Sequence, residues 1–316
     1  MALSAQHRDL VPTYGRHRAG IAILPGESNE QWAARAGLDW EAKKTPVLFD
    51  DGEGIATADE RAVLYRSDTR APLGVVSNRF KTFQPRDVVA FYDDLTKRHG
   101  FTLTDAGCFK GGKIVWAKAE TGDVMRIHGN DVLKGYVLLS TSFDGSLATT
   151  ARFSTLRLAC MNGLTVGEDL APVVRVSHRS IFDADAAKVK LGVGDAFIRF
   201  QQQAEMMAAK HVTERQTIEF FLQVYHDMKA EAIVTAQQEK TTDKTIARLA
   251  QHFIAAPGAD MRSAAGTAWG LLNAVTYDID HCARARSDEN RDASAMFGNG
   301  ERVKNKARDL ALAMAA

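Results

Sequence analysis

Positively charged and aromatic residues alternate at three places in the first half of the sequence. Proteins that bind single-stranded nucleic acid use such mixtures, because cations neutralise phosphates and aromatic rings stack on bases. The nucleic-acid-binding residues predicted on this basis are Arg79, Phe80, Lys81, Lys110, Lys113, Arg152, Phe153 and Arg157. The alternative is that the rings belong to the hydrophobic core, where aromatic side chains are common.

A fourth group of cations lies near the C-terminus, where Gly298-Asn299-Gly300 precedes a basic helical pattern that includes Lys304. A glycine turn before a basic helix can bind phosphate through backbone N–H groups. Lys304 therefore joins the predicted nucleic-acid-binding residues. The spacing is not that of a nucleotide-binding P-loop, and a solvated terminal helix is the alternative.

The segment 266–286 predicts a helix with an apolar face and a polar stripe. The stripe consists of Asn273, Tyr277, Asp280, His281 and Arg284. It fits a solvated face, a contact between helices or the lining of a groove, and these alternatives stay open. A metal-dependent nucleic-acid hydrolase would use Asp144, Asp278, Asp280 and His281, but no HExxH motif or second His-carboxylate cluster supports one.

A nucleophilic enzyme finds little support in the sequence. Cys160, beside Asn162 and with His178 further along the chain, is a candidate nucleophile. Cys160 falls on an apolar strand face, which favours a buried, unreactive thiol. No G-x-S-x-G elbow or dinucleotide fingerprint is present. The sequence therefore gives no positive case for an enzyme, and it predicts no cofactor and no metal site.

The elements that must position these residues centre on residues 135–163. Asp144-Gly145 is a strong hairpin signal between runs rich in Val, Leu, Thr and Phe. Before the turn, Val137, Leu139 and Phe143 share one face, opposite a face of hydroxyl groups. The pattern predicts a half-buried antiparallel sheet whose polar face either holds a polyanion or is simply wetted by solvent.

The chain as a whole predicts an α+β protein in three parts. Residues 1–28 are polar and favour a flexible arm, residues 29–178 a β-rich domain of antiparallel hairpins with packed helices, and residues 179–316 a helical region on or beside it. Short helices are expected over 29–40 and after Pro85. Long helical patterns follow over 184–228, 242–256 and 265–286.

Charge and cysteine content further limit the class of protein. The formal net charge of the 316 residues is only +1, yet residues 61–118 contain 11 Lys and Arg against five Asp, a local excess of 11 − 5 = +6. The three cysteines are widely spaced and form no CxxC pair, which argues against a disulfide framework. No signal peptide or long apolar run is evident, and we expect a cytoplasmic protein that does not enter a membrane.

Several blocks of the sequence, taken together, resemble a family of phage/plasmid-like proteins grouped as a domain of unknown function. These are LGVVSNRFKTFQPRDVVAFYDDL, AGCFKGGKIVWAKAE, SFDGSLATTARFSTLRLACMNGL and TAWGLLNAVTYDIDH with SAMFGNGERVKNKA. The resemblance runs from about Leu38 to Ala307, with departures at Phe80, where Tyr is expected, and at Met161-Asn162-Gly163, where Cys-Asn-Thr is more usual. It implies a mobile-element context without a settled activity.

The outline of hairpins followed by helices is also similar to that of ring-forming single-strand annealing proteins, by analogy of fold alone. The resulting prediction is an oligomeric phage or plasmid protein that binds single-stranded DNA in replication or recombination, with strand annealing as one role. Its partners would be single-stranded DNA, further copies of itself, and host or phage replication proteins. The alternatives are the metal-dependent hydrolase and a protein that binds a host factor.

Overall fold

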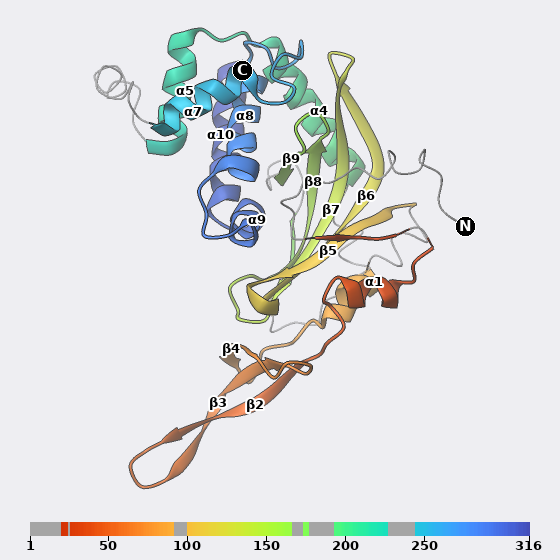
Figure 1. Cartoon of the computed structure of the whole chain (residues 1–316), viewed down its shortest axis with the longest axis vertical. Coiled ribbons are helices and arrows are strands. Elements are labelled where there is room, and N and C mark those ends of the chain that lie inside the picture. The colour runs from red at the N-terminus through yellow and green to blue at the C-terminus, as the bar shows by residue number, and fades with distance from the viewer. Residues whose placement is uncertain (1–19, 25, 92–99, 166–172, 177–192, 227–243) are drawn as a thin grey trace.

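A computed structural model shows an α+β protein in which antiparallel sheets precede a mostly helical C-terminal region (Figure 1). It describes residues 20–24, 26–91, 100–165, 173–176, 193–226 and 244–316. The predicted fold class is confirmed. Most of the predicted arm over 1–28 and the predicted boundary near 178 lie outside the described residues, as does His178. Within the described part, no helix is long and apolar enough to cross a membrane.

The larger sheet has seven antiparallel strands in the order β1-β5-β6-β7-β8-β10, with β9 also paired to β8. We call it the central sheet. Its strands are β1 (Ile21–Ala22), β5 (Thr102–Phe109), β6 (Ile114–Ile127), β7 (Asp131–Ser142), β8 (Thr149–Arg157), β9 (Asn162–Thr165) and β10 (Val174–Val176). Consecutive strands from β5 to β9 are neighbours, as expected for a chain of hairpins. The 3-10 turn η2 (Lys110–Gly112) joins β5 to β6.

The predicted hairpin around Asp144-Gly145 joins β7 to β8. Gly145 has a φ of 78°, a conformation that glycine adopts at little cost, and the Asp144 carboxylate accepts the Ser146 N–H at 2.9 Å. Val137, Leu139 and Phe143 are buried in one cluster, so the predicted apolar face is confirmed. The sheet is not half-buried, however, because nearly every residue of β7 is buried on both faces.

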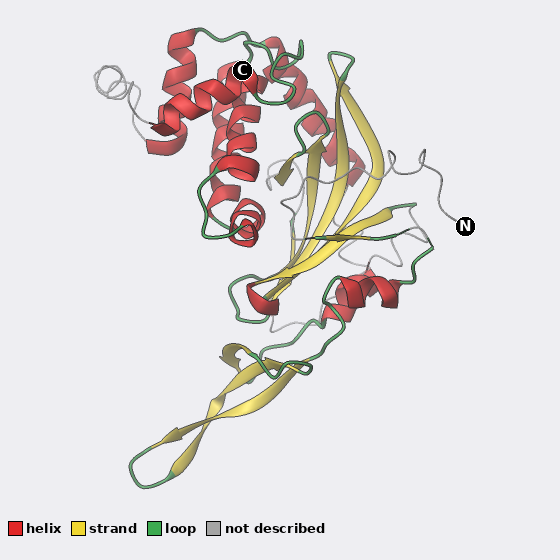
Figure 2. Cartoon of the chain, viewed as in Figure 1, coloured by secondary structure: helices red, strands yellow, loops and turns green. Residues whose placement is uncertain are grey.

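The smaller sheet contains β2 (Ala42–Asp50), β3 (Ile55–Arg66) and β4 (Pro72–Ser77), paired antiparallel in that order. The sequence predicted its strand–turn–strand part around β4 and the turn near 50–54, but not a separate sheet. Beyond β4, β2 and β3 continue as a two-stranded ribbon that projects from the body (Figures 1 and 2). We call this ribbon, with its turn over residues 51–54, the arm. It is a different region from the flexible arm predicted over residues 1–28.

The short helix α1 (Asn29–Arg35) precedes the arm and confirms the helix predicted over 29–40. It begins at a capping box, in which Ser28 and Gln31 each accept the other's backbone N–H. Helical structure also begins at Pro85, as predicted, and its described part ends at Phe91. Trp32 of α1 is fully buried against residues of the central sheet, including Val115 and Val137.

The C-terminal helices are α4 (Val193–Ala209), α5 (Glu214–His226), α7 (Lys244–Ala255), α8 (Ala268–Tyr277), α9 (Asp288–Phe297) and α10 (Asn299–Ala315). A π-helical turn, η3 (Asp278–Cys282), extends α8. The predicted cap of α5 is confirmed, because Thr213 and Gln216 exchange side-chain and backbone hydrogen bonds. The helices gather beside the β8–β9 side of the central sheet (Figure 1).

Both faces of the central sheet are covered, which explains its burial. On one face, Phe153 contacts Phe197 of α4 with ring centroids 5.9 Å apart. On the other, Trp116 and Leu138 pack with Ala293 of α9. The hydroxyl-bearing face was considered above as a possible site for a polyanion. It is covered by α9 and α10 and is therefore not a free surface.

Candidate functional site

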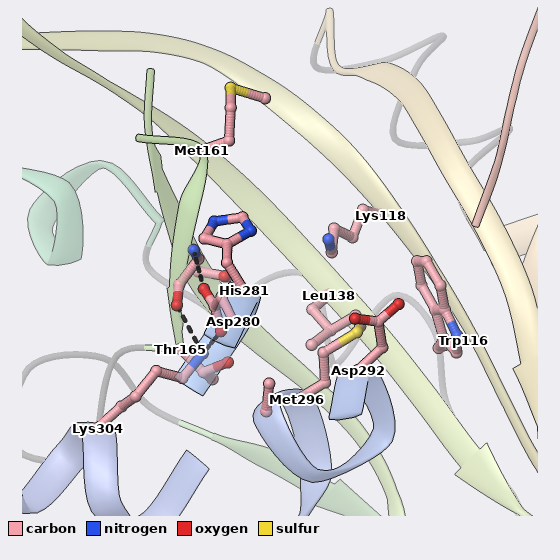
Figure 3. Close-up of a pocket in the computed structure, with 13 residues that line it drawn as sticks. Trp116, Lys118, Leu138, Met161, Thr165, Asp280, His281, Asp292, Met296 and Lys304 are labelled. Atoms are coloured by element: carbon pink, nitrogen blue, oxygen red, sulfur yellow. Dashed lines mark hydrogen bonds and ion pairs between the residues drawn. The ribbon is translucent and has the colours of Figure 1, made fainter. Parts of the chain in front are cut away.

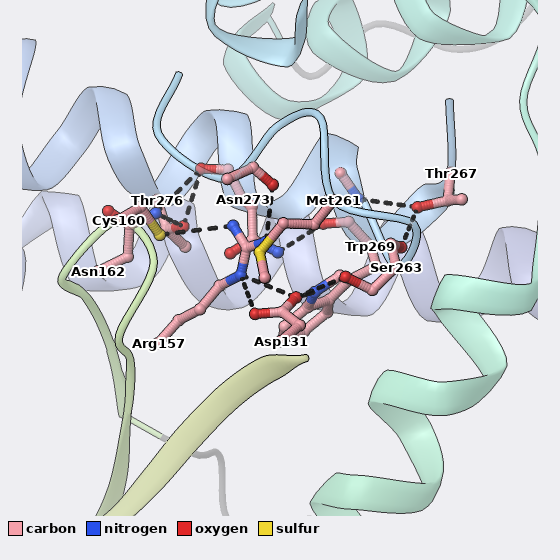
Figure 4. Close-up of polar contacts among 12 residues, drawn as sticks. Asp131, Arg157, Cys160, Asn162, Met261, Ser263, Thr267, Trp269, Asn273 and Thr276 are labelled. Atoms are coloured by element: carbon pink, nitrogen blue, oxygen red, sulfur yellow. Dashed lines mark hydrogen bonds and ion pairs between the residues drawn. The ribbon is translucent and has the colours of Figure 1, made fainter. Parts of the chain in front are cut away.

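Arg157 lies in the interior and is held by a buried carboxylate (Figure 4). Its Nε donates to both oxygens of Asp131, at 2.7 and 3.0 Å. Its Nη2 donates to the Gly258 carbonyl at 2.9 Å. Arg157 is 3% exposed and Asp131 is fully buried, so this guanidinium is not available to phosphate.

The Asp131 carboxylate connects the central sheet to the helices. Besides the two bonds from Arg157, it accepts the Ser263 hydroxyl at 2.6 Å and the Trp269 indole N–H at 2.9 Å. A buried carboxylate needs such partners, because an unpaired charge in the interior costs several kcal/mol. The network therefore stabilises the contact between the start of β7, the end of β8 and α8.

Arg152, Phe153 and Lys304 are also committed to packing inside the protein. Arg152 forms an ion pair with Glu301 of α10, and Phe153 is fully buried. Lys304 is 4% exposed and donates to the Asp280 carboxylate at 2.8 Å and to the Gly163 carbonyl at 2.7 Å. The proposed contacts of these three residues and of Arg157 with nucleic acid would require the C-terminal helices to leave the sheet.

A pocket lies between the central sheet and the C-terminal helices (Figure 3). Its lining includes Trp116, Lys118 and Leu138 from the sheet, and Asp280, His281, Asp292, Met296 and Lys304 from η3, α9 and α10. Both lysines of its wall have acidic neighbours: Lys304 pairs with Asp280 of the same wall, and Lys118 lies 3.7 Å from Asp105, which is outside it. This balance of charge favours a structural junction over a strong anion site.

The predicted polar stripe is divided between several contacts. Asp280 accepts the Gly163 N–H at 2.8 Å, and the Asn273 carbonyl accepts the side-chain amide of Asn162 at 3.2 Å. His281 lies 3.0 Å from the Cys160 carbonyl, and its ring is 4.9 Å from that of Tyr277. Most of the stripe thus attaches η3 and α8 to β9 and the turn before it, while Arg284 is exposed.

The carboxylates considered for a metal site have other partners. Asp278 is 1% exposed and accepts two hydrogen bonds from Arg248, at 2.6 and 3.0 Å. Asp144 lies at the β7–β8 turn, where its backbone approaches Gly74 of β4, and is not brought to η3. In the described part of the chain, no group of three or more His, Cys, Asp or Glu side chains could hold a metal ion.

Cys160, the candidate nucleophile, is buried, as the sequence predicted. Burial raises the pKa of its thiol, and the nearby Arg157 guanidinium opposes that shift only in part. A thiol with a raised pKa is a poor nucleophile at neutral pH. We therefore assign Cys160 a packing role.

An exposed basic face lies on the smaller sheet, on the side away from the body. Lys43 pairs with Tyr65 across β2 and β3, and Arg61 pairs with Ser77 across β3 and β4. Because side chains alternate across a strand, these residues share one face with Val75, which is 57% exposed. We call this surface the outer face. Lys43 and Arg61 are exposed, and neither forms an ion pair with another described residue.

Arg79 and Lys81 lie directly after β4, and Lys81 lies near Lys44, on the side of the sheet opposite to Lys43. Phe80 between them is 9% exposed and belongs to the core, so the two flanking side chains point outward and are exposed. The ammonium of Lys44 has a lowered pKa, because it is partly buried and because Lys81 lies near it.

The turn with Lys110 and Lys113 joins the same region. Arg66, the last residue of β3, donates from its guanidinium to the Gly111 carbonyl at 3.2 Å. Lys110 is exposed and Lys113 is half-buried. Four of the predicted binding residues, Arg79, Lys81, Lys110 and Lys113, therefore lie near the smaller sheet and outside the buried core.

Sequence analysis missed Lys43, Arg61 and Tyr65. Residues 61–65, RAVLY, show no alternation of polar and apolar residues, and Lys43 and Lys44 are adjacent, so the sequence gave no indication of which side chains face solvent. The cross-strand register decides this. Phe80 and Phe153, in contrast, follow the alternative interpretation, since both rings belong to the core.

The chain belongs to a family described as a domain of unknown function, DUF932, whose model matches residues 72–296. The match begins at Pro72, the first residue of β4, so β2 and β3 precede it. No curated protein matches the chain, and no solved structure does.

Proposed function

We propose that the chain is a phage- or plasmid-type protein that binds single-stranded DNA through the outer face and acts in replication or recombination. The observation that carries the proposal is the exposed placement of Lys43 beside Tyr65, with Arg61 on the same face. A cation beside a partly exposed aromatic ring can hold a phosphate while the ring stacks on a base. A bacterial cytoplasm with replication proteins as partners is the setting that fits this role.

The four surface residues predicted from the sequence lie near the smaller sheet but not on its outer face. Arg79 and Lys81 lie at the end of β4, and Lys110 and Lys113 lie on the turn beside Arg66. A single strand on the outer face would meet the exposed Lys43 and Arg61, whereas the pocket beneath α9 and α10 offers matched charges. The outer face is therefore the better supported binding surface.

Fluorescence anisotropy with a labelled single-stranded oligonucleotide and its duplex tests the proposal. We expect preference for the single strand and binding that weakens as salt increases. In the double variant Lys43→Ala with Arg61→Ala, the slope of log K against log salt should fall by about 1.4, since each lost phosphate contact on a single strand removes about 0.7.

The double variant Lys210→Ala with Arg262→Ala serves as the control, because both residues are exposed cations in the helical region. It should retain the affinity and the salt slope of the unmodified protein. Equal slopes in both double variants and the unmodified protein would contradict the assignment of the outer face. No binding of either oligonucleotide at low salt would contradict the proposed function itself.

A further inference from the structure

The pocket between the central sheet and the C-terminal helices has the size and composition of a small-molecule site (Figure 3). Its volume is about 700 Å³, including the part that is open to solvent. Ligand pockets commonly have volumes of about 300–1,000 Å³, with a mostly apolar lining and a few polar groups that orient the ligand. The apolar side chains of this lining are Trp116, Leu138, Met161, Ala295 and Met296.

The charged groups of the lining favour an uncharged ligand. The lining contains two lysines, Lys118 and Lys304, and two aspartates, Asp280 and Asp292. Lys304 pairs with Asp280 at 2.8 Å, and Lys118 lies 3.7 Å from Asp105. A phosphate group would meet a carboxylate near each ammonium group, so the pocket gives it little net attraction.

Asp292 and Lys118 provide the polar contacts for such a ligand. Asp292 lies on α9 and is 8% exposed, and Figure 3 shows that its carboxylate and the Lys118 ammonium group both point into the pocket. A carboxylate has about four acceptor sites, and an ammonium group has three donors. Both groups can therefore bind a ligand while they keep their contacts within the protein.

Trp116, in the same lining, gives an independent sign of a missing partner. Its side chain is 1% exposed, and its indole N–H has no acceptor among the described residues. Buried polar groups nearly always have a hydrogen-bond partner, and a buried group without one needs an explanation. A ligand in the pocket can supply the acceptor.

Two unusual backbone conformations hold another part of the lining. Met161 has a φ of 55°, in the left-handed region that is costly for a residue other than glycine. His281 lies in the π-helical turn η3, and π-helical turns occur frequently at functional sites. The two elements are in contact, because His281 lies 3.0 Å from the Cys160 carbonyl. Backbone strain of this kind is concentrated at sites that bind ligands.

The apolar part of the lining fits a flat aromatic ligand. Met161 and Met296 contribute thioether groups, whose sulfur atoms make favourable contacts with aromatic rings. The indole of Trp116 adds an aromatic surface. A planar heterocycle can therefore contact these side chains while its polar edge meets Asp292 and Lys118.

We propose that this pocket binds a guanine base. Guanine has two adjacent donors, N1–H and the 2-amino group, next to the acceptor O6. The two donors match the two oxygens of the Asp292 carboxylate, and O6 accepts a hydrogen bond from Lys118. Adenine, cytosine and thymine lack two adjacent donors on this edge, so each would place an acceptor against the carboxylate. The base can come from a free nucleoside or from single-stranded DNA, since the edge is the same in both.

Isothermal titration calorimetry of the full chain with guanosine, inosine and adenosine tests the proposal. Inosine lacks the 2-amino group and should bind about tenfold or more weakly than guanosine, because one hydrogen bond to a charged group is lost. Adenosine should bind more weakly still. No binding of guanosine up to its solubility, or equal binding of the three nucleosides, would overturn the proposal.

The variant Asp292→Asn keeps the shape of the side chain and replaces one acceptor by a donor. It should bind guanosine about tenfold or more weakly, and the preference for guanosine over inosine should disappear. Asp260→Asn is the matched control, since Asp260 is exposed and does not line the pocket, and it should bind like the unmodified protein. An Asp292→Asn variant that retains the preference for guanosine would overturn the assignment.

Two labelled oligonucleotides distinguish the sources of the base: one of thymidines alone, and one with a single central deoxyguanosine. If the pocket takes a base from a strand, the second should bind more tightly to the unmodified protein, and Asp292→Asn should remove the difference. Equal binding, with guanosine still bound, assigns the pocket to free nucleosides. The pocket does not depend on the outer face: if neither oligonucleotide binds while guanosine does, the proposed function fails and the guanine site stands.

Discussion

The chain uses the same residue types in two different ways, in the interior junction around Arg157 and on the outer face around Lys43. At the junction, a guanidinium that is 3% exposed meets a fully buried carboxylate. On the outer face, Lys43 and Arg61 are exposed and lack an ionic partner among the described residues. Charge alone therefore does not indicate function; a cation that lacks a partner is available to a ligand, while a paired one stabilises the fold.

The largest expected effect concerns the stability of the interior junction around Arg157. Asp131→Ala leaves Arg157 buried without its carboxylate, and should lower the free energy of unfolding by about 3–5 kcal/mol. Urea denaturation followed by circular dichroism measures this loss. Arg61→Ala on the outer face should change the stability by only about 0.5 kcal/mol or less. Similar losses in the two variants would contradict the distinction between the regions.

The second expected effect concerns the junction between η3, α10 and β9. Lys304→Met keeps most of the apolar stem but leaves the Asp280 carboxylate and the Gly163 carbonyl without the ammonium group. The cost of such buried, unsatisfied groups is about 1–3 kcal/mol. Arg302→Met, an exposed change on the same helix, is the control in the denaturation measurement. A stable Lys304→Met variant with reduced DNA binding would instead return Lys304 to the nucleic-acid site.

A third prediction concerns the role of Tyr65 in DNA binding by the outer face. Tyr65→Ala should weaken binding of single-stranded DNA by about 1–3 kcal/mol, the range found for a lost base–aromatic stack. Tyr65→Phe keeps the ring and should bind nearly as well as the unmodified protein. Anisotropy titrations at one salt concentration compare the three proteins. If the Phe and Ala variants lose affinity equally, the hydroxyl group and not stacking is what matters.

The smallest expected effect concerns the exposed ion pair between Arg66 and Asp68. Arg66 donates two hydrogen bonds to Asp68 and holds the pKa of that carboxyl at about 2. Because the folded pKa lies below the unfolded value of about 3.9, the stabilisation is complete above pH 4 or so and is lost as the pH falls toward the folded value. Asp68→Ala should therefore cost no more than about 1 kcal/mol at pH 7, since the pair is exposed to solvent.

Urea denaturation of the unmodified protein and the Asp68→Ala variant between neutral and acidic pH checks this linkage. The difference in stability between the two proteins should shrink as the pH falls through the acidic range. A difference that is constant with pH would show that the loss comes from packing, for example from movement of Arg66 off the Trp40 ring, which lies 4.5 Å from the guanidinium carbon.

Local patterns in the sequence were sufficient to predict much of the fold. Asp144-Gly145, the Thr213–Gln216 cap and the end of α7 before Pro257 each depend on the preferences of neighbouring residues. The alternation of Val137 and Leu139 likewise identified a strand face. The sequence also indicated that Cys160 is buried and that cations are concentrated near the base of the arm.

The tertiary structure alone decided which cations are available. Arg152 and Glu301 are separated by 149 positions in the chain, and Arg157 and Asp131 by 26, yet each pair is in contact. Lys43 and Lys44 are neighbours, but only the cross-strand register separates the one on the outer face from the one beside Lys81. Propensity and periodicity act over a few residues, whereas the partner of a charge is chosen by how distant segments pack.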